Sequence, residues 1–530
     1  MYVLAYAPWG SDGIIIRVEA DIRRGIPGID ITGLAEGAVR ESRERVRASF
    51  RNSGLEFPLD RILINLAPAG VRKEGASLDL SIAFSVMAAA GQIAIPDNLM
   101  VLGELELSGR VRPVRGVLAA ISAGLKADIK EFIVPLENAG EAAILSSESF
   151  PNYRYFAAAT LREAVHALKV RAETGELPAN SGLTTNFNLK EREDEIWAGD
   201  FSEVQGQYRY KRALEIAAAG GHNLLVFGPP GSGKTMLARR FPSILPPLLS
   251  HEAVEVTRLY SIAGQIKADE ISALINQPPF RSPHHSASTE GLLGGGRIVR
   301  PGEITLAHFG TLFLDEALEF RSSVLQSLRE PLEDRVITIV RAEGPLKLPA
   351  DFQLILAANS CPCGSLGNRN SAACLCSADE IRRYWRKIGS ALLDRIELRV
   401  PVNNPGILIP SGNNTEEKSY VIRERVAKAH EIQRARYSGT DIRRNSRMTP
   451  AMMEKFCSLT QDAKNKFSIA ASKLGLSGRA CHGVLKIALT IANLEGKESI
   501  ETVHILEAVQ HRRYGEDPYD ILSSDILHDN

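Results

Sequence analysis

Short apolar runs alternate with longer apolar or amphipathic segments along most of this chain. The stretches 13–18 and 61–66 are rich in Ile, Leu and Val and are bounded by polar residues, which predicts strands. From Asp79 to Ala90 the chain is mostly apolar and then reaches Gly91, which predicts a buried helix. Strands and helices in this order are typical of an α/β domain, which we place at residues 1–170.

The remaining sequence divides into further parts. Residues 171–197 are polar and weakly periodic, which favours a linker. A second α/β region spans 198–405, and the turn-rich segment NNPGILIPSGNN follows it. Helical periodicity with few strand signals predicts a helical domain at 416–515, with a tail at 516–530. The expected fold class is therefore α/β and multidomain.

The amino-acid composition excludes some classes of protein. The chain has 530 residues, and at about 150 residues per domain this suggests three or four domains. Lys and Arg total 63, as do Asp and Glu, which excludes a wholesale basic protein such as a histone but permits local basic surfaces. No apolar run reaches about 18 residues, and the first residues lack a secretory pattern. We therefore expect no membrane span and a cytoplasmic location.

A glycine-rich loop follows the predicted strand 222–227. It has the pattern G-x-x-x-x-G-K-T and runs into a helix-forming segment, an arrangement in which the loop backbone surrounds phosphate groups. Lys234 is expected to reach the β and γ phosphates, and Thr235 is expected to bind Mg²⁺. The whole candidate ATP loop is Gly228, Pro229, Pro230, Gly231, Ser232, Gly233, Lys234 and Thr235.

Two later strands end in polar residues that suit the same chemistry. The apolar run 311–314 ends at Asp315 and Glu316. Asp315 is expected to hold Mg²⁺, and Glu316 to polarise the attacking water, as hydrolysis of ATP requires. The apolar run 352–358 ends at Asn359, whose amide is placed to orient the same water or the γ phosphate.

With these motifs the chain resembles the AAA+ ATPases. The resemblance implies that Asn359 is the sensor-1 residue. Arg395, in the LLDRI sequence, matches the arginine finger that acts across a subunit boundary, and Arg479, in LSGRA, matches the sensor-2 arginine. It further implies that Asn359 and Arg479 sense nucleotide within their own chain. It also implies that the active form is a ring, in particular a hexamer. The alternative for each arginine is an ordinary surface position on a helix.

Inserted segments indicate which group of AAA+ ATPases the chain resembles. Thr235 and Asp315 are 80 residues apart, more than a minimal nucleotide-binding unit needs, and the interval holds RSPHHSAS at 281–288. For His284 and His285 we favour structural roles, because adjacent side chains point in different directions on regular structure.

The segment 336–348 contains two β-prone runs around Glu343 and Gly344, which predicts a hairpin. Both insertions resemble those of the AAA+ clade with magnesium chelatase ATPase subunits and replicative helicases. In those helicases such hairpins face the pore, which makes Arg341 and Lys347 candidate DNA contacts. The alternative is an ordinary solvated hairpin.

Over nearly its full length the chain resembles the magnesium-chelatase-like family that includes the ComM-type (YifB-like) competence proteins. The segments that carry this likeness are 73–83, RSPHHSAS and 482–496. The resemblance implies a hexameric, ATP-driven DNA helicase that promotes branch migration while transforming DNA is integrated by homologous recombination. The alternatives are a magnesium chelatase ATPase subunit and an ATP-dependent chaperone or scaffold.

The N-terminal domain also resembles the proteolytic domain of Lon, around residues 75–77 and 103–111. Lon uses a Ser-Lys dyad, in which the lysine activates the serine. Ser77 falls near the serine position, but the lysine position reads Val-Leu-Ala-Ala at 117–120. We therefore expect a Lon-like fold without protease activity.

Four of the six cysteines cluster in one insertion just after Asn359. They form two C-x-C pairs within residues 361–376, and four close thiols in a reducing compartment favour tetrahedral Zn²⁺. Free thiols and redox or Fe–S chemistry remain the alternatives. The candidate zinc ligands are Cys361, Cys363, Cys374 and Cys376.

Three local basic stretches suit salt-dependent, sequence-independent binding to single-stranded or branched DNA. In the second stretch Tyr384 and Trp385 are interleaved, and their rings could stack on bases. The alternative for each stretch is a solvated or subunit-interface helix face. The three sets are Arg40, Arg43, Arg45, Arg47 and Arg51; Arg382, Arg383, Arg386 and Lys387; and Arg434, Arg436, Arg443, Arg444 and Arg447.

Overall fold

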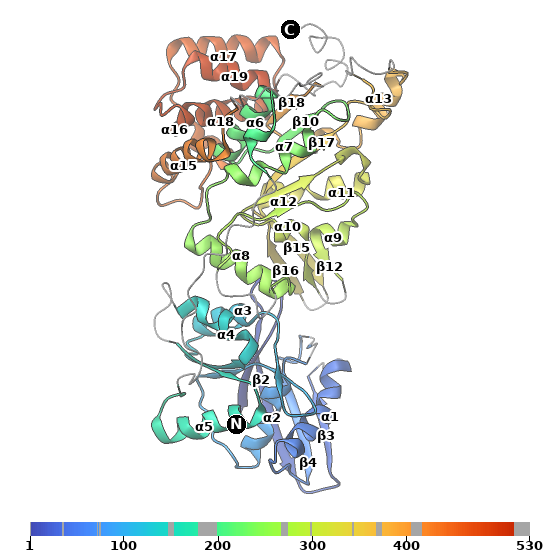
Figure 1. Ribbon diagram of the computed structural model, residues 1–530, viewed down its shortest axis with the longest axis vertical. Coiled ribbons are helices and arrows are strands. Elements are labelled where there is room, and N and C mark those ends of the chain that lie inside the picture. The colour runs from blue at the N-terminus through green and yellow to red at the C-terminus, as the bar shows by residue number, and fades with distance from the viewer. Residues whose placement is uncertain are drawn as a thin grey trace.

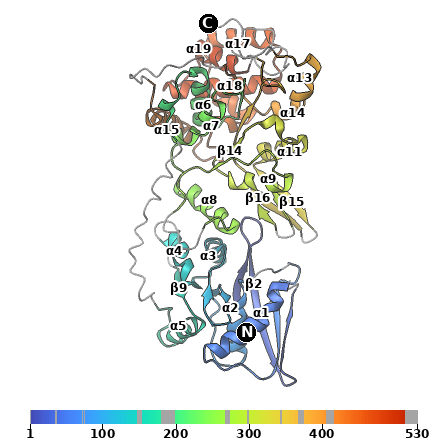
Figure 2. The ribbon, with the colours of Figure 1, turned by 45° about the vertical axis from the view of Figure 1, so that its right-hand side comes forward.

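The molecule has three parts that follow one another along its long axis in the computed structural model (Figures 1 and 2). An N-terminal α/β domain lies at one end, a central α/β domain in the middle, and C-terminal helices at the other end. Of the predicted linker 171–197, residues 171–174 belong to a helix, whereas 179–197 and the tail 516–530 lie outside the described residues. The structure describes residues 2–33, 37–71, 73, 76–146, 153–178, 199–266, 274–296, 299–341, 344–366, 374–403 and 416–512.

A seven-stranded mixed sheet organises the N-terminal domain, in the order β3-β4-β2-β1-β5-β8-β9. The predicted strands 13–18 and 61–66 and the helix from Asp79 are confirmed, because they correspond to β2, β4 and α2. Nearly every α2 side chain is buried, as its apolar composition requires. The bounds are β1 Tyr2–Ala7, β2 Ile14–Arg23, β3 Gly28–Thr32, α1 Gly37–Asn52, β4 Arg61–Ala67, α2 Asp79–Ala89, β5 Leu99–Val101, β6 Glu104–Leu105, β7 Val111–Arg112, α3 Val117–Lys126, β8 Glu131–Pro135, α4 Ala139–Ala143, β9 Arg154–Ala158 and α5 Leu161–Thr174.

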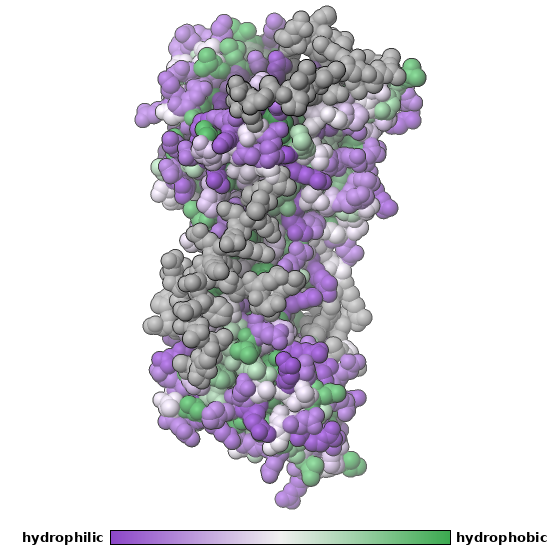
Figure 3. Space-filling model, viewed as in Figure 1, coloured by the Kyte–Doolittle hydropathy of each residue, from purple (hydrophilic) through white to green (hydrophobic). Residues whose placement is uncertain are grey.

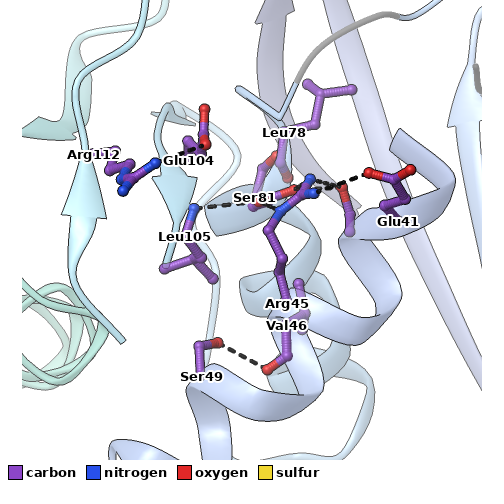
Figure 4. Close-up of polar contacts among 11 residues, drawn as sticks. Glu41, Arg45, Val46, Ser49, Leu78, Ser81, Glu104, Leu105 and Arg112 are labelled. Atoms are coloured by element: carbon purple, nitrogen blue, oxygen red, sulfur yellow. Dashed lines mark hydrogen bonds and ion pairs between the residues drawn. The ribbon is translucent and has the colours of Figure 1, made fainter. Parts of the chain in front are cut away.

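One buried carboxylate ties α1 to α2. The Asp79 side chain is completely buried and accepts a hydrogen bond from Arg45 Nε at 2.7 Å and one from the Ser42 hydroxyl. Leu105 donates its backbone N–H to the same carboxylate at 3.2 Å (Figure 4). Burial raises the pKa of Asp79, and the charge of Arg45 opposes that rise. Arg45, one of the candidate DNA residues, is thus used inside the domain.

The central domain contains a five-stranded parallel sheet in the order β11-β14-β17-β10-β18. Since all the strands are parallel, their carboxyl ends share one edge, where ligands bind in open α/β sheets. The bounds are α6 Tyr208–Gly220, β10 Leu224–Phe227, α7 Lys234–Ala238, β11 Phe280–Arg281, β14 Thr311–Leu314, α11 Ser322–Ser327, α12 Arg329–Asp334, β17 Gln353–Ala358, α13 Ala378–Trp385, α14 Ser390–Leu393 and β18 Leu398–Pro401.

Two groups of inserted elements project from this sheet toward the N-terminal domain (Figure 1). The predicted hairpin is confirmed as the antiparallel pair β15 and β16, in which Thr338 lies opposite Lys347. Residues 342–343 at its turn lie outside the described part. The bounds are α8 Ser250–Ala263, α9 Thr289–Leu293, β12 Gly294–Gly295, β13 Arg300–Pro301, α10 Glu303–Leu306, β15 Val336–Arg341 and β16 Gly344–Pro349.

In residues 416–512, which the structure describes, helices form the C-terminal part, as the sequence predicts. The second half of α18 is almost entirely buried between α6, α15 and α19, because Val, Ile, Ala and Leu recur on several of its faces. Buried His222, just before β10, makes a 2.8 Å hydrogen bond from Nε2 to Thr490 Oγ1 of α18. The bounds are α15 Ser419–Arg436, α16 Pro450–Phe456, α17 Gln461–Lys473, α18 Gly478–Leu494 and α19 Thr502–Arg512.

The N-terminal domain contacts the central domain through α8 and the hairpin. The Ser261 hydroxyl of α8 donates to the buried carboxylate of Glu141. Arg258 Nη1 lies 2.9 Å from Asp12 Oδ1, in the turn between β1 and β2. In the same turn, a Cβ on Gly10 would lie only 3.1 Å from the Leu346 side chain of the hairpin. The middle of the hairpin therefore packs against the N-terminal domain.

Hydrophilic residues dominate the face shown in Figure 3, and hydrophobic residues are scattered among them. Such scattered apolar positions are ordinary for a protein surface. Among the helices that the structure describes, none has the length and apolar character needed to span a membrane.

Candidate functional site

The glycine-rich loop leaves β10 at the carboxyl edge of the central sheet. Gly231 and Gly233 have φ angles of 77° and 82°, a region that side chains rarely adopt. A Cβ on Gly228 would lie 2.1 Å from the Val402 carbonyl oxygen, so only glycine fits there. The loop therefore has the tight curvature that a phosphate-binding backbone requires.

Lys234 is held inside this loop. Its Nζ donates to the carbonyl oxygens of Gly228 at 2.8 Å and Pro229 at 2.7 Å, and lies 3.3 Å from Asn359 Oδ1. Burial lowers the pKa of Lys234 to about 8, against the opposing influence of Asp315. The ammonium group is thus in a place where phosphate oxygens would strengthen its charged form.

The strand ends bring the other predicted residues to the same place. Thr235 Oγ1 lies 3.1 Å from Asp315 Oδ1, which pairs the hydroxyl and carboxylate that Mg²⁺ prefers. Asn359 joins them because β17 lies between β10 and β14, so that its end meets theirs. These residues fit a magnesium nucleotide, as the sequence motifs indicate.

Glu316 differs from its neighbours in conformation and exposure. Its φ of 49° is left-handed, and 56% of its side chain is exposed, beside the loop rather than inside it. Glu316 Oε2 lies 3.4 Å from Nδ1 of His285, whose ring stacks on that of His284. The sequence analysis did not assign His285 to this site. The RSPHHSAS motif alone gives no distance to Asp315 and Glu316, since the contact joins the segment 281–288 to the end of the sheet strand β14.

Arg395 and Arg479 lie at the opposite edge of the sheet. Arg395 precedes β18, whose first residue pairs with the first residue of β10, and its guanidinium is ion-paired with Glu333. Arg479 Nη2 lies 3.8 Å from the same carboxylate of Glu333. Both arginines are therefore a full strand length from the P-loop (residues 228–235) of their own chain. This arrangement favours action on a neighbouring subunit, and sensing of nucleotide by Arg479 within its own subunit stays a prediction.

The four clustered cysteines converge on one point. Cys361 Sγ lies 3.3 Å from Cys363 Sγ and 3.6 Å from Cys374 Sγ, and all four sulfurs lie within 4.8 Å of one another. Tetrahedral Zn²⁺ with bonds of about 2.3 Å would space its sulfurs by about 3.8 Å. The backbone N–H of Ser365 donates to Cys363 and lowers the pKa of its thiol. Burial raises the pKa of the Cys361 thiol, so the spacing of the sulfurs, and not the thiol pKa values, is what fits a zinc site.

The two hairpin residues predicted to contact DNA differ in their exposure to solvent. Lys347 is exposed on β16. Arg341 is half-buried and donates to the Gly296 carbonyl oxygen, so part of its hydrogen-bonding capacity is already used. Val340, beside Arg341, is 79% exposed and gives the hairpin an apolar side chain in solvent.

In the second stretch, Arg382, Arg383 and Arg386 are exposed on α13. Lys387 donates to the Leu318 carbonyl oxygen at 2.7 Å and is not exposed. Tyr384 and Trp385 are buried in the core, so the expected stacking of bases on their rings is wrong. The amphipathic period of α13 places its arginines and aromatic residues on opposite faces.

Most of the third stretch is engaged inside the protein, although all its members lie in the helical part. Arg443 pairs with Glu252. Arg447 Nη2 lies 2.8 Å from Asp351 Oδ1. These arginines join the helical part to the central domain and do not form a free basic face.

The chain matches three family models in order. These are "Subunit ChlI of Mg-chelatase" at residues 18–138, "Magnesium chelatase, subunit ChlI" at 200–407 and the C-terminal model of that subunit at 416–512. The fold and site thus define an AAA+-type ATPase of the magnesium chelatase ChlI class.

Full-length relatives agree with this class. An uncharacterized protein, YifB, of Salmonella typhimurium is 39% identical over 512 residues, 96% of each chain. The competence protein ComM of Haemophilus influenzae is 38% identical over 517 residues, covering 96% of this chain and 97% of its own. The chain belongs to the ChlI-related family that contains YifB and ComM.

The resemblance to Lon is confirmed in part. Lon protease of Geobacter metallireducens is 27% identical over 142 residues, which is 26% of this chain and 17% of that protein. Residues 117–120, at the expected lysine position, form the buried apolar first turn of α3. Among the described residues, the base of a Ser-Lys dyad with Ser77 is therefore missing at that position.

Proposed function

We propose that this protein is an ATP-hydrolysing ring motor that acts on DNA, a helicase promoting branch migration during homologous recombination of transforming DNA. The observation that carries the proposal is the placement of two charged sets at opposite edges of one sheet. Lys234, Thr235 and Asp315 meet at the carboxyl edge. Arg395 and Arg479 share Glu333 at the other edge. Neither set alone completes a site that stabilises charge on a transferred phosphoryl group.

Each residue has a role in hydrolysis. Lys234 and the loop N–H groups bind the phosphates, and Thr235 and Asp315 would hold Mg²⁺, which neutralises charge between the β and γ phosphates. Glu316 orients and polarises the attacking water, and Asn359 positions the water or the γ phosphate. The Glu316 carboxylate lies beside His285, 3.4 Å from its Nδ1.

In an assembled ring, a neighbouring subunit supplies the second set of charged residues, Arg395 and Arg479, to each ATP site. Arg395 and Arg479 lie together beside Glu333. The Arg479 side chain is 47% exposed, where a neighbouring subunit can present its own P-loop, whereas that of Arg395 is 14% exposed and has to turn outward. In this proposal both arginines leave Glu333 and contact the neighbour's nucleotide. A closed ring, a hexamer in our proposal, gives every P-loop such a partner.

DNA contacts are assigned to two surfaces. The hairpin offers Lys347 and Arg341, and the outer face of α13 offers Arg382, Arg383 and Arg386. Electrostatic contact with phosphates requires exposed cations and gives little sequence specificity. Of these residues, Lys347, Arg383 and Arg386 are the better candidates, because Arg341 already bonds to a carbonyl group and Arg382 Nη1 lies 3.7 Å from Asp379 Oδ1.

The first experiment measures ATP turnover by the assembled protein with and without single-stranded and branched DNA, together with strand displacement. Lys234→Ala should abolish turnover, whereas Lys473→Ala, at an exposed lysine on α17, should not. Glu316→Gln should bind ATP but hydrolyse it about 10² to 10⁴ times more slowly. Normal turnover in Lys234→Ala would refute the assigned site.

ATP turnover that does not change when DNA is added, together with no strand displacement, would contradict the motor proposal. The magnesium chelatase ATPase subunit is the second candidate, because the matching family models carry that description. Recovery of a porphyrin-binding partner would favour it. ATP-dependent assembly with neither partner nor displacement would favour a chaperone or scaffold.

A further inference from the structure

The four-cysteine cluster lies against the ATP site rather than at a remote surface. Cys361 follows Asn359 by two residues and is completely buried in the core under β17. From Cys361 the chain turns back toward the P-loop. A Cβ on Gly364 would lie 3.1 Å from Pro230 Cδ, so the cysteine loop and the P-loop are in contact.

The second pair of cysteines leads into α13. Cys376 directly precedes Ser377, whose hydroxyl accepts the N–H of Glu380 and caps the helix. Near the other end of α13, Trp385 packs edge-on against Phe227, with ring centroids 5.5 Å apart. Phe227 is the last residue of β10, directly before the P-loop.

The same helix also contacts the other two strand ends. Trp385 Nε1 donates to the Ser360 carbonyl oxygen at 3.1 Å, next to Asn359. Tyr384 donates its hydroxyl to Glu319 Oε1 at 3.0 Å, three residues beyond Glu316. The two C-x-C pairs are thus attached to opposite sides of the hydrolytic machinery. One pair continues from the Asn359 strand, and the other leads into the helix that supports the P-loop strand and the Glu316 segment.

We propose that Zn²⁺ bound by the four cysteines is a structural clamp on the ATP site, which holds Asn359 and the P-loop in the geometry that hydrolysis needs. The inference rests on the proposed ATPase function and adds metal dependence to it. Zinc–thiolate bonds restrict the cysteine loop far more than thiol contacts do, because four ligands must keep a tetrahedral arrangement. Loss of the metal frees the Cys361–Gly364 turn to move away from Pro230.

The test uses the full-length assembled protein and two kinds of variant. Cys363→Ser with Cys376→Ser removes one ligand from each pair at positions that are not in the core. Cys457→Ala, in the helical part, is the matched cysteine control. Gly364→Ala keeps all four thiols but places a Cβ against Pro230 and strains the turn, because the φ of Gly364 is 76°.

Three readouts accompany turnover: zinc content by elemental mass spectrometry, binding of a fluorescent non-hydrolysable ATP analogue, and hydrogen exchange over 228–235 and 359–366. Wild type and Cys457→Ala should hold about one zinc per chain. The double serine variant should hold none, exchange faster over both segments and turn over ATP at least tenfold more slowly. Gly364→Ala should keep its zinc and still turn over ATP severalfold more slowly.

Several results would overturn the inference. One is a zinc-free double variant with wild-type exchange over both segments, and another is such a variant with wild-type turnover. A wild-type protein that holds no zinc and is fully active would also contradict it. A wild type that binds zinc but never hydrolyses ATP would instead contradict the proposed function, while hydrogen exchange would still decide whether the metal holds the P-loop.

Discussion

The buried ammonium group of Lys234 should make ATP affinity depend on pH above neutrality. Its pKa is lowered to about 8 in the nucleotide-free site, by burial. Phosphate oxygens stabilise the charged form, so ATP binding raises the pKa of Lys234 and takes up a proton when the lysine is neutral. Affinity is therefore full below pH 8 and falls as the pH rises through the pKa of the free site.

The size of the effect follows from the pKa. At pH 7 about one lysine in eleven is neutral, and at pH 9 about ten in eleven are, so the dissociation constant should rise about tenfold. That factor corresponds to about 1.4 kcal/mol. At pH 8, binding should take up about half a proton per nucleotide.

Titration with a fluorescent non-hydrolysable ATP analogue at pH 7, 8 and 9 measures the change in affinity. Calorimetry in buffers of different ionisation enthalpy measures the proton uptake. Lys234→Arg is the matched control, because its guanidinium stays charged throughout and also reports any titration of the phosphates. Equal pH dependence in wild type and Lys234→Arg would refute the reasoning, as would wild-type affinity that does not change.

Three further outcomes are expected. Lys234→Ala and Arg479→Ala should each lack ATP turnover alone but regain it when the two proteins are mixed. If Arg479 acts on the neighbouring subunit, a mixed ring contains interfaces at which an intact Lys234 meets an intact Arg479. Mixtures that stay inactive would place the action of Arg479 in its own subunit. Asp79→Ala removes the buried carboxylate that accepts hydrogen bonds from Arg45, Ser42 and Leu105, and should lower the free energy of unfolding by about 3 kcal/mol, measured with urea. A loss below about 1 kcal/mol would contradict this. Arg383→Ala with Arg386→Ala should reduce the salt slope of single-strand binding by about 1.4, at about 0.7 per lost phosphate contact; an unchanged slope would remove α13 from the DNA surface.

The ATP site is the part that sequence predicts best. The P-loop, Asp315 and Asn359 are each recognisable beside an apolar strand, and parallel strands bring their carboxyl ends to one edge. Local pattern and a general property of the fold are sufficient here. The same argument cannot find His285, because its contact with Glu316 depends on how the segment 281–288 folds against the end of β14.

The arginines show where local pattern is insufficient. Arg479 begins a helix as expected, but its distance from the P-loop depends on where the helical part packs. Tyr384 and Trp385 stand among basic residues in the sequence and yet are buried, because an eight-residue helix separates its two faces. Charge counted along the chain therefore overstates the basic surface.

By itself the sequence determined the order of strands and helices, the phosphate loop and the position of two C-x-C pairs within one insertion. These depend on periodicity, glycine conformation and short spacing, which are local properties of the chain. Only the tertiary structure decided that Arg395 and Arg479 share Glu333, that α13 turns its aromatic residues inward, and that the cysteine loop touches Pro230. Those contacts join residues far apart in the chain, and the packing of whole elements sets their distances.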